Sequence, residues 1–126
     1  MALEAEVEKL VEDFLADFDA VRFNGYRRFF VEGPQLTLII PRVGLIRGLD
    51  AYLEYESRST KLSERRSFWE DRSVEFFGDV ARVMGSIRMS YSDGQERREI
   101  REFITFLLER RDNGWKCFHL QATLNV

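Results

Sequence analysis

Apolar residues recur every three or four positions over residues 3–19, and acidic residues fill the positions between them. This spacing predicts an amphipathic helix that buries one face. A second short helix is expected over residues 19–30, with Asp19 as its N-cap, and a third over residues 48–59. The N-terminal half of the chain is therefore mainly helical.

Two short apolar runs, residues 36–40 and 43–46, separate the second and third helices and predict short strands. A charged loop over residues 60–65 leads to residues 66–126, which predict four long strands in sequence. Turn residues stand at the three joints of this meander, at Phe77-Gly78-Asp79, Ser92-Asp93-Gly94-Gln95 and Asp112-Asn113-Gly114. The whole pattern predicts an α+β fold: three N-terminal helices packed on a strongly curved, mostly antiparallel sheet.

Side chains alternate between the two faces of a strand, so each face is readable from the sequence. Residues 99–109 are apolar on both faces, with Phe103 and Leu107 opposite Ile104, Phe106 and Leu108. The last strand places five side chains on one face by the same alternation: Trp115, Cys117, His119, Gln121 and Thr123. A strand that is apolar on both faces is covered on both. Because the helices cover only one face, we expect a homodimer through the outer face of the sheet.

The composition fits one domain over residues 1–126, with 44% hydrophobic and 33% charged residues. Eleven Phe, four Tyr and two Trp favour a core or cavity lined with rings. The net charge of −3 with interspersed signs argues against nucleic acid, and no apolar run is long enough to span a membrane. A single cysteine, Cys117, and no recognisable secretory signal lead us to expect a cytoplasmic protein. No cofactor is expected.

The order of elements resembles the nuclear transport factor 2-like superfamily. Local marks of the resemblance are Gly78-Asp79-Val80-Ala81, Asn113-Gly114-Trp115-Lys116 followed by His119, and Ile87 to Tyr91 followed by Asp93-Gly94-Gln95. The superfamily includes ketosteroid isomerase, SnoaL-like polyketide cyclases and the association domain of calcium/calmodulin-dependent kinases, which the last mark resembles in particular. The resemblance implies a cone-shaped fold with a pocket at its wide end, often in a dimer. It implies no activity, because this fold carries many unrelated functions.

The catalytic positions of ketosteroid isomerase are not matched here. Its oxyanion-hole tyrosine falls at Phe14, its base falls at Ile40, and its second acid falls near Ile104 or Thr105. Proton abstraction next to a carbonyl needs a base within hydrogen-bond reach, so classical isomerase chemistry is disfavoured. One pocket arginine of the kinase association domain matches Arg88, whereas a second falls at Phe106. That family's usual His-x-His-x-Ser on the last strand is represented here by His119, Gln121 and Thr123.

Candidate site residues each have a functional and a structural interpretation. His119 is the only histidine, so a histidine-based metal cluster is excluded, and no metal is expected. His119 is either a polar contact in the pocket or a hydrogen-bonded structural residue. Arg88 either holds an anionic group or pairs with an acid on a neighbouring strand. Asp71 is a candidate general base if it faces the pocket beside Trp69; otherwise it faces solvent, balanced by a nearby arginine.

The expected pocket combines aromatic and polar residues: Phe14, Phe18, Tyr26, Tyr52, Tyr55, Trp69, Arg88, His119 and Gln121. The aromatic members are alternatively plain core. Three functional hypotheses remain open. The first is a dimer whose pocket binds a small, partly apolar ligand. The second is an isomerase, cyclase or dehydratase with Asp71 or His119 as acid or base. The third is an oligomerisation scaffold whose cavity is packed solid.

Overall fold

The computed structural model describes residues 2–58, 63–112 and 114–125 of the chain. Three helices and six strands follow one another in the order α1 (Ala2–Ala20), α2 (Phe23–Phe29), β1 (Thr37–Ile40), β2 (Gly44–Arg47), α3 (Leu49–Arg58), β3 (Ser63–Phe77), β4 (Val80–Ser92), β5 (Arg97–Arg111) and β6 (Gly114–Leu124). The three helices, the two short strands and the four long strands agree with the prediction in kind and order, but β3 begins at Ser63, so residues 63–65 of the predicted loop are strand. The rest of that predicted loop, residues 60–62, lies outside the described residues. The predicted turn residue Asn113 lies outside the described residues.

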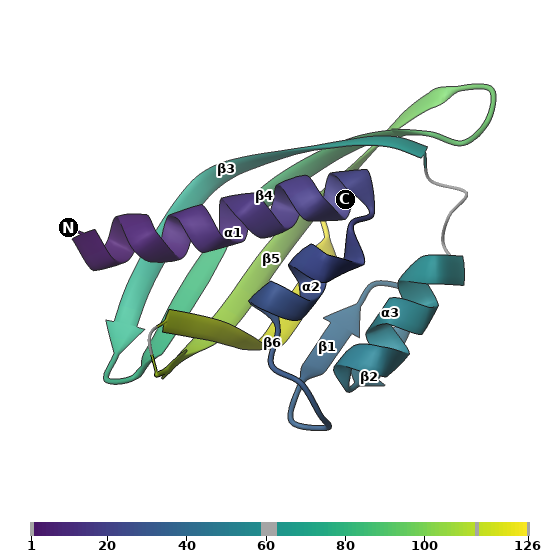
Figure 1. Cartoon of the computed structure of the whole chain (residues 1–126). Helices are drawn as coiled ribbons and strands as arrows, with labels where there is room; N and C mark the ends of the chain where they lie inside the picture. The colour runs from purple at the N-terminus through teal and green to yellow at the C-terminus, as the bar shows by residue number, and fades with distance from the viewer. Residues whose placement is uncertain (1, 59–62, 113, 126) are drawn as a thin grey trace.

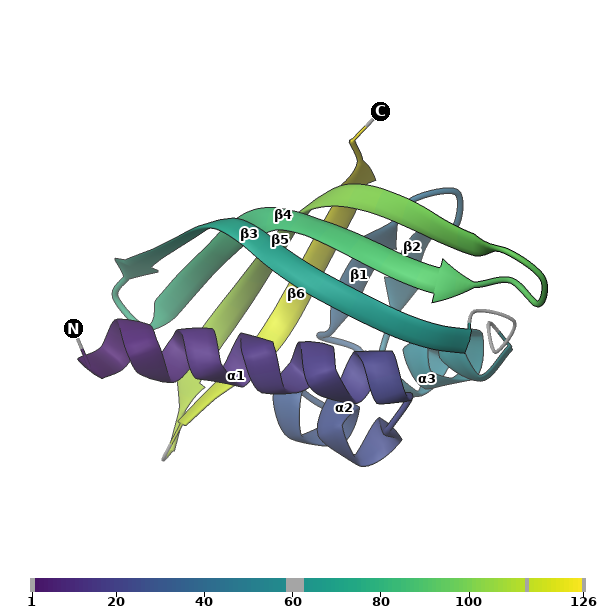
Figure 2. The ribbon, with the colours of Figure 1, turned by 90° about the horizontal axis from the view of Figure 1, so that it is seen from above.

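The six strands form one sheet with the order β2-β1-β6-β5-β4-β3. Strand β1 pairs with β6 in parallel, and every other pairing is antiparallel. The sheet curves strongly, and α1 runs across its concave side with α2 and α3 beside it (Figures 1 and 2). The α+β architecture with a curved, mostly antiparallel sheet is thus confirmed. Among the described residues, no helix is long and apolar enough to cross a membrane.

Aromatic rings join α1 and α2 to the middle of the sheet. The Phe14 ring of α1 stacks on Phe29 of α2 with 4.6 Å between ring centroids. Phe106 of β5 meets Phe29 edge-on at 5.6 Å. Phe30, directly after α2, meets Tyr52 of α3 edge-on at 5.6 Å. Pairs in these geometries stabilise by more than their buried area alone, so this cluster fixes all three helices on the concave face.

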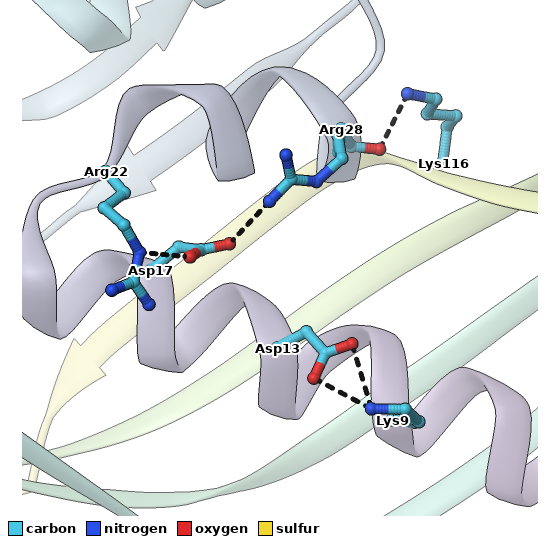
Figure 3. A network of polar contacts seen from close by, with 6 residues as sticks. All are labelled: Lys9, Asp13, Asp17, Arg22, Arg28 and Lys116. Atoms are coloured by element: carbon cyan, nitrogen blue, oxygen red, sulfur yellow. Dashed lines mark hydrogen bonds and ion pairs between the residues drawn. The ribbon is translucent and has the colours of Figure 1, made fainter.

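The junction between α1 and α2 is held by one buried carboxylate. Asp17 accepts a hydrogen bond from Arg22 at 2.8 Å and pairs with Arg28 at 3.5 Å (Figure 3). Its carboxyl group lies directly against Gly25, where an added Cβ would stand 1.8 Å from Oδ2. Lys116 of β6 donates to the backbone carbonyl of Arg28 at 2.7 Å. Glycine at position 25 is therefore required for the close approach of the two helices.

Asp19 does not cap α2 as predicted. The N-cap position is Arg22, which makes no side-chain cap hydrogen bond. The Asp19 carboxylate instead accepts hydrogen bonds from the backbone N–H and the hydroxyl of Ser67, at 2.7 and 2.6 Å. The prediction is wrong because α1 continues through Ala20, which places Asp19 where it links the helix to β3.

Irregularities in pairing change which side chains face the helices. In β3 the register shifts between Glu70 and Ser73, and Asp71 has a positive φ of 52°. In β6 the pairing skips Phe118, because Leu107 pairs with His119 whereas Leu108 pairs with Cys117. An extra residue of this kind reverses the alternation beyond it. The two shifts therefore decide which predicted site residues reach the concave side.

Candidate functional site

A cavity of about 350 Å³ lies between the concave face of the sheet and helices α1 and α3. Its walls are mainly aromatic and aliphatic, with a few polar groups. The lining comprises Phe14, Leu15, Phe18, Ile40, Pro41, Arg42, Tyr52, Tyr55, Glu56, Arg65, Ser67, Ile87, Met89, Tyr91, Ile100, Glu102, Ile104, Leu120, Ala122 and Leu124. Small-molecule sites are typically concave, largely apolar and about 300–1,000 Å³ in volume. This cavity is largely apolar, and its volume lies at the lower end of that range.

Four of the predicted aromatic residues line this cavity: Phe14, Phe18, Tyr52 and Tyr55. Two others do not. Tyr26 and Trp69 are buried in the core beside it. The indole of Trp69 packs against Gly85 of β4, where an added Cβ would lie 2.2 Å from Nε1. For these two residues the structural interpretation holds.

Arg88, His119 and Gln121 lie away from the cavity, contrary to the expectation. Arg88 stacks over the exposed Phe68 ring at 4.5 Å and pairs with Glu70 at 3.3 Å. His119 Nδ1 shares a 2.7 Å hydrogen bond with the hydroxyl of Thr37. The β6 bulge at Phe118 explains the error in the last strand, because it exchanges the two faces beyond it. Trp115 and Cys117 face the helices before the bulge, and Leu120 and Ala122 face them after it. His119 and Gln121 therefore face outward. His119 is thus a hydrogen-bonded residue of the outer face.

Asp71 is exposed and lies at the β3 bulge rather than beside Trp69. The extra residue between Glu70 and Ser73 interrupts the alternation on which its predicted position depended. Neither candidate acid or base therefore reaches the cavity, because Asp71 and His119 are both outside it.

A buried ion pair forms one polar part of the cavity wall. Arg65 of β3 donates to Glu56 of α3 at 3.4 Å, and the two side chains are 1% and 5% exposed. Tyr52 donates to the other oxygen of Glu56 at 3.0 Å. Arg65 also donates to the backbone carbonyl of Phe18 at 3.3 Å and stacks over its ring. Burial raises the pKa of Glu56, while Arg65 and Tyr52 oppose that rise.

Glu102 is a cavity residue that the sequence interpretation missed. It lies on β5 and lines the cavity, and its two cross-strand neighbours, Ile87 of β4 and Leu124 of β6, are both aliphatic. Burial raises the pKa of its carboxyl group. A signal was present in the sequence: Glu102 falls in the same alternation as Ile100 and Ile104, where an acid is unexpected.

The cavity therefore offers hydrocarbon walls, one internally neutralised ion pair, the separate carboxyl group of Glu102, and further polar groups at its edge, those of Arg42, Tyr55, Ser67 and Tyr91. Such a set can enclose a small apolar body and contact it at one or two polar points. Among the described residues, no group of three or more His, Cys, Asp or Glu side chains is placed to hold a metal ion. Phe14 and Ile40, the positions compared above with isomerase catalytic residues, both line the cavity and provide no acid or base.

Solved structures similar to this chain share the nuclear transport factor 2-like fold. A superfamily protein from Salmonella enterica serovar Typhimurium aligns with a TM-score of 0.89 and 17% identity, over 99% of this chain and 92% of the other. The CaMKII hub of S. rosetta aligns with a TM-score of 0.84 and 18% identity, over 96% of this chain and 95% of the other. The type 3 hexachlorocyclohexane dehydrochlorinase from Novosphingobium barchaimii aligns with a TM-score of 0.85 and 18% identity, over 99% of this chain and 88% of the other. At these identities the likeness establishes the fold alone.

The family follows from the sequence itself. The model of the SnoaL-like domain matches residues 7–124, which is nearly the whole chain, and the chain belongs to this family. No curated protein sequence matches the chain. The predicted superfamily and the cone fold are thus confirmed, whereas an activity does not follow from them.

Proposed function

We propose that this SnoaL-like domain binds a small, partly apolar molecule in the cavity between the sheet and helices α1 and α3. The observation that carries the proposal is an open volume of about 350 Å³ lined by aromatic and aliphatic side chains. At roughly 30 Å³ for each water-sized group, this volume accommodates about a dozen non-hydrogen atoms. A bicyclic aromatic compound with one polar substituent has the matching size.

The apolar wall would supply most of the affinity, because burial of hydrocarbon surface is favourable at about 25 cal/mol per Å². The polar points would orient the ligand. Glu56 and Arg65 are already satisfied by each other and by Tyr52, so they cost nothing further when a ligand covers them. The scaffold hypothesis predicted a cavity filled by Phe and Leu side chains, and the open volume argues against it.

Isothermal titration calorimetry with 2-naphthylmethanol tests the proposal. Ala122 lies on the cavity wall, so Ala122→Phe would fill part of the volume and abolish binding. The matched control is Ala51→Phe, the same substitution at an exposed position of α3, which would leave binding unchanged. Binding that survives in Ala122→Phe, or is absent from the unmodified protein, would contradict the proposal.

A second candidate function is that of a SnoaL-like enzyme that acts on a carbonyl compound as an isomerase, cyclase or dehydratase. The observation in its favour is the Glu102 carboxyl group, which lies in the cavity and has a raised pKa because it is buried. A carboxyl with a raised pKa is better suited to proton transfer near neutral pH. Glu102 replaces Asp71 and His119 in this hypothesis, because both lie outside the cavity.

Exchange of the α-protons of 2-tetralone in heavy water, followed by proton NMR, tests the second candidate. If Glu102 abstracts a proton, the protein accelerates the exchange and Glu102→Gln removes the acceleration. Equal rates for the protein, the variant and buffer alone would leave only the binding function.

We further propose that the domain forms a homodimer through the outer face of the sheet. Large apolar side chains stay exposed there, among them Phe68, Met84 and Phe103, the last with 52% of its surface accessible. An exposed apolar patch on a sheet is typical of an interaction site. A second copy of the chain would cover this face symmetrically and would leave the cavity, on the other side of the sheet, accessible.

A further inference from the structure

The carboxylate of Glu102 in the cavity has no hydrogen-bond or ion-pair partner among the described residues. The hydrogen bonds and ion pairs of the described residues include none to the Glu102 carboxylate, although its neighbours Ile100 and Ile104 face the same cavity. Its cross-strand neighbours are Ile87 and Leu124, both hydrocarbon. An ionised carboxylate against such a wall is costly unless a donor reaches it. Glu102 is half-buried, so water reaches it in the free protein, and a ligand that covers it must bring a donor of its own.

Within the described part of the chain, no hydrogen bond or ion pair joins Glu102 to another charged or titratable group of the cavity. Arg65 is engaged by Glu56 and by the Phe18 carbonyl. Arg42 is exposed in the turn after β1, where water screens its charge. Burial raises the pKa of Glu102 and no cationic side chain opposes that rise. The full set facing the cavity is Arg42, Tyr52, Tyr55, Glu56, Arg65, Tyr91 and Glu102.

We propose that Glu102 is the recognition group of the cavity, and that the ligand class is a small apolar molecule with a hydrogen-bond donor, preferentially a protonated amine. This inference rests on the proposed binding function. An ammonium group beside Glu102 forms a charge-assisted hydrogen bond that is strong in an apolar environment. The apolar body then lies against Phe14, Ile87 and Ile104.

The same geometry discriminates against other ligands of equal size. A carboxylate ligand would place a second negative charge next to Glu102 in a weakly solvated site, which is unfavourable. A pure hydrocarbon would fill the volume but leave Glu102 without a donor. An alcohol donates one neutral hydrogen bond and falls between these cases. The predicted order of affinity is amine, alcohol, hydrocarbon, carboxylate.

Calorimetric titration at neutral pH with four probes of one shape tests the inference: 2-naphthylmethylamine, 2-naphthylmethanol, 2-methylnaphthalene and 2-naphthoate. We expect the amine to bind at least about tenfold more tightly than the hydrocarbon, as one charge-assisted hydrogen bond would give. Glu102→Gln keeps the shape of the side chain, and we expect it to remove the preference for the amine. The matched control is Glu99→Gln, on the same strand but exposed, which would leave the order unchanged.

Each outcome decides a different claim. The predicted order in the unmodified protein, lost in Glu102→Gln and kept in Glu99→Gln, supports the inference. Equal binding of all four probes, or an amine preference that persists in Glu102→Gln, overturns the inference and leaves the cavity as a binding site. If none of the four probes binds, the proposed function fails and the inference falls with it.

Discussion

The ion pair between Arg65 and Glu56 provides a quantitative test of the cavity wall. Replacing Arg65 by Met keeps most of the side-chain volume but removes the charge and its donors. Of the hydrogen bonds that the described residues make to it, the carboxylate of Glu56, 5% exposed, then keeps the one from Tyr52. Removing one partner of a buried pair typically costs about 3–5 kcal/mol. Because the donor distances here are 3.3–3.4 Å, we expect the lower end, about 3 kcal/mol.

Urea unfolding at pH 7 and pH 5 measures this loss. Burial already raises the pKa of Glu56 in the folded state, and Arg65 opposes that rise. Without Arg65 the folded-state pKa rises further. When the pKa of an acid is higher in the folded state than in the unfolded state, the free energy of unfolding falls as the pH rises through the folded-state pKa. The Arg65→Met variant should therefore lose more stability at pH 7 than at pH 5, where Glu56 binds a proton more readily.

Two further variants separate the pair from other effects. In the double variant Arg65→Met with Glu56→Gln no buried charge is left unpaired, so its stability should exceed that of Arg65→Met, with a coupling of more than about 1 kcal/mol. Arg58→Met removes an exposed pair with Glu54 and should cost about 0.5 kcal/mol or less. A cost of Arg65→Met no larger than that of Arg58→Met, or a cost that does not depend on pH, would contradict a stabilising buried pair between Arg65 and Glu56.

Three other predictions concern different parts of the chain. Gly25→Ala should cost about 1–3 kcal/mol in urea unfolding, because its Cβ would collide with the Asp17 carboxylate; Gly114→Ala, which meets no atom within 4 Å, is the control, and equal costs would contradict the close-approach argument. Glu102→Gln should raise the melting temperature at pH 7, with a gain that shrinks toward pH 4, because burial raises the folded pKa of Glu102; an unchanged melting temperature would contradict this. Phe103→Glu puts a charge in place of an exposed ring on the outer face and should shift the protein from dimers to monomers in sedimentation velocity. A dimer that persists in this variant would contradict the proposed interface.

The order of elements was predictable because strong periodic signals carry it. Ile104, Phe106 and Leu108 were expected on one face of their strand, and all three are buried, whereas Phe103 on the other face is exposed. The Gly78 joint likewise connects β3 and β4 as its residues indicate. The pairing of β5 with β4 is regular throughout, so on β5 the local sequence determines the face of every side chain.

The site was less predictable because single-residue bulges decide it. The skip at Phe118 carries His119 and Gln121 to the outer face, and the shift at Asp71 removes that carboxylate from the cavity side. Bulges of this kind carry no strong local signature. The pairing of Arg65 with Glu56 depends on how α3 docks beside β3, which is a tertiary contact that the alternation of one segment does not contain.

Methyl NMR titration with 2-naphthylmethanol would locate the binding site, because it reports where in the molecule the probe binds. We expect saturable shifts for methyl groups that line the cavity, those of Ile87, Ile104 and Leu120, while the exposed methyl groups of Ile39 and Leu45 stay unchanged. Shifts confined to Ile39 and Leu45, or no saturable shift at any methyl group, would contradict a ligand site inside the cone.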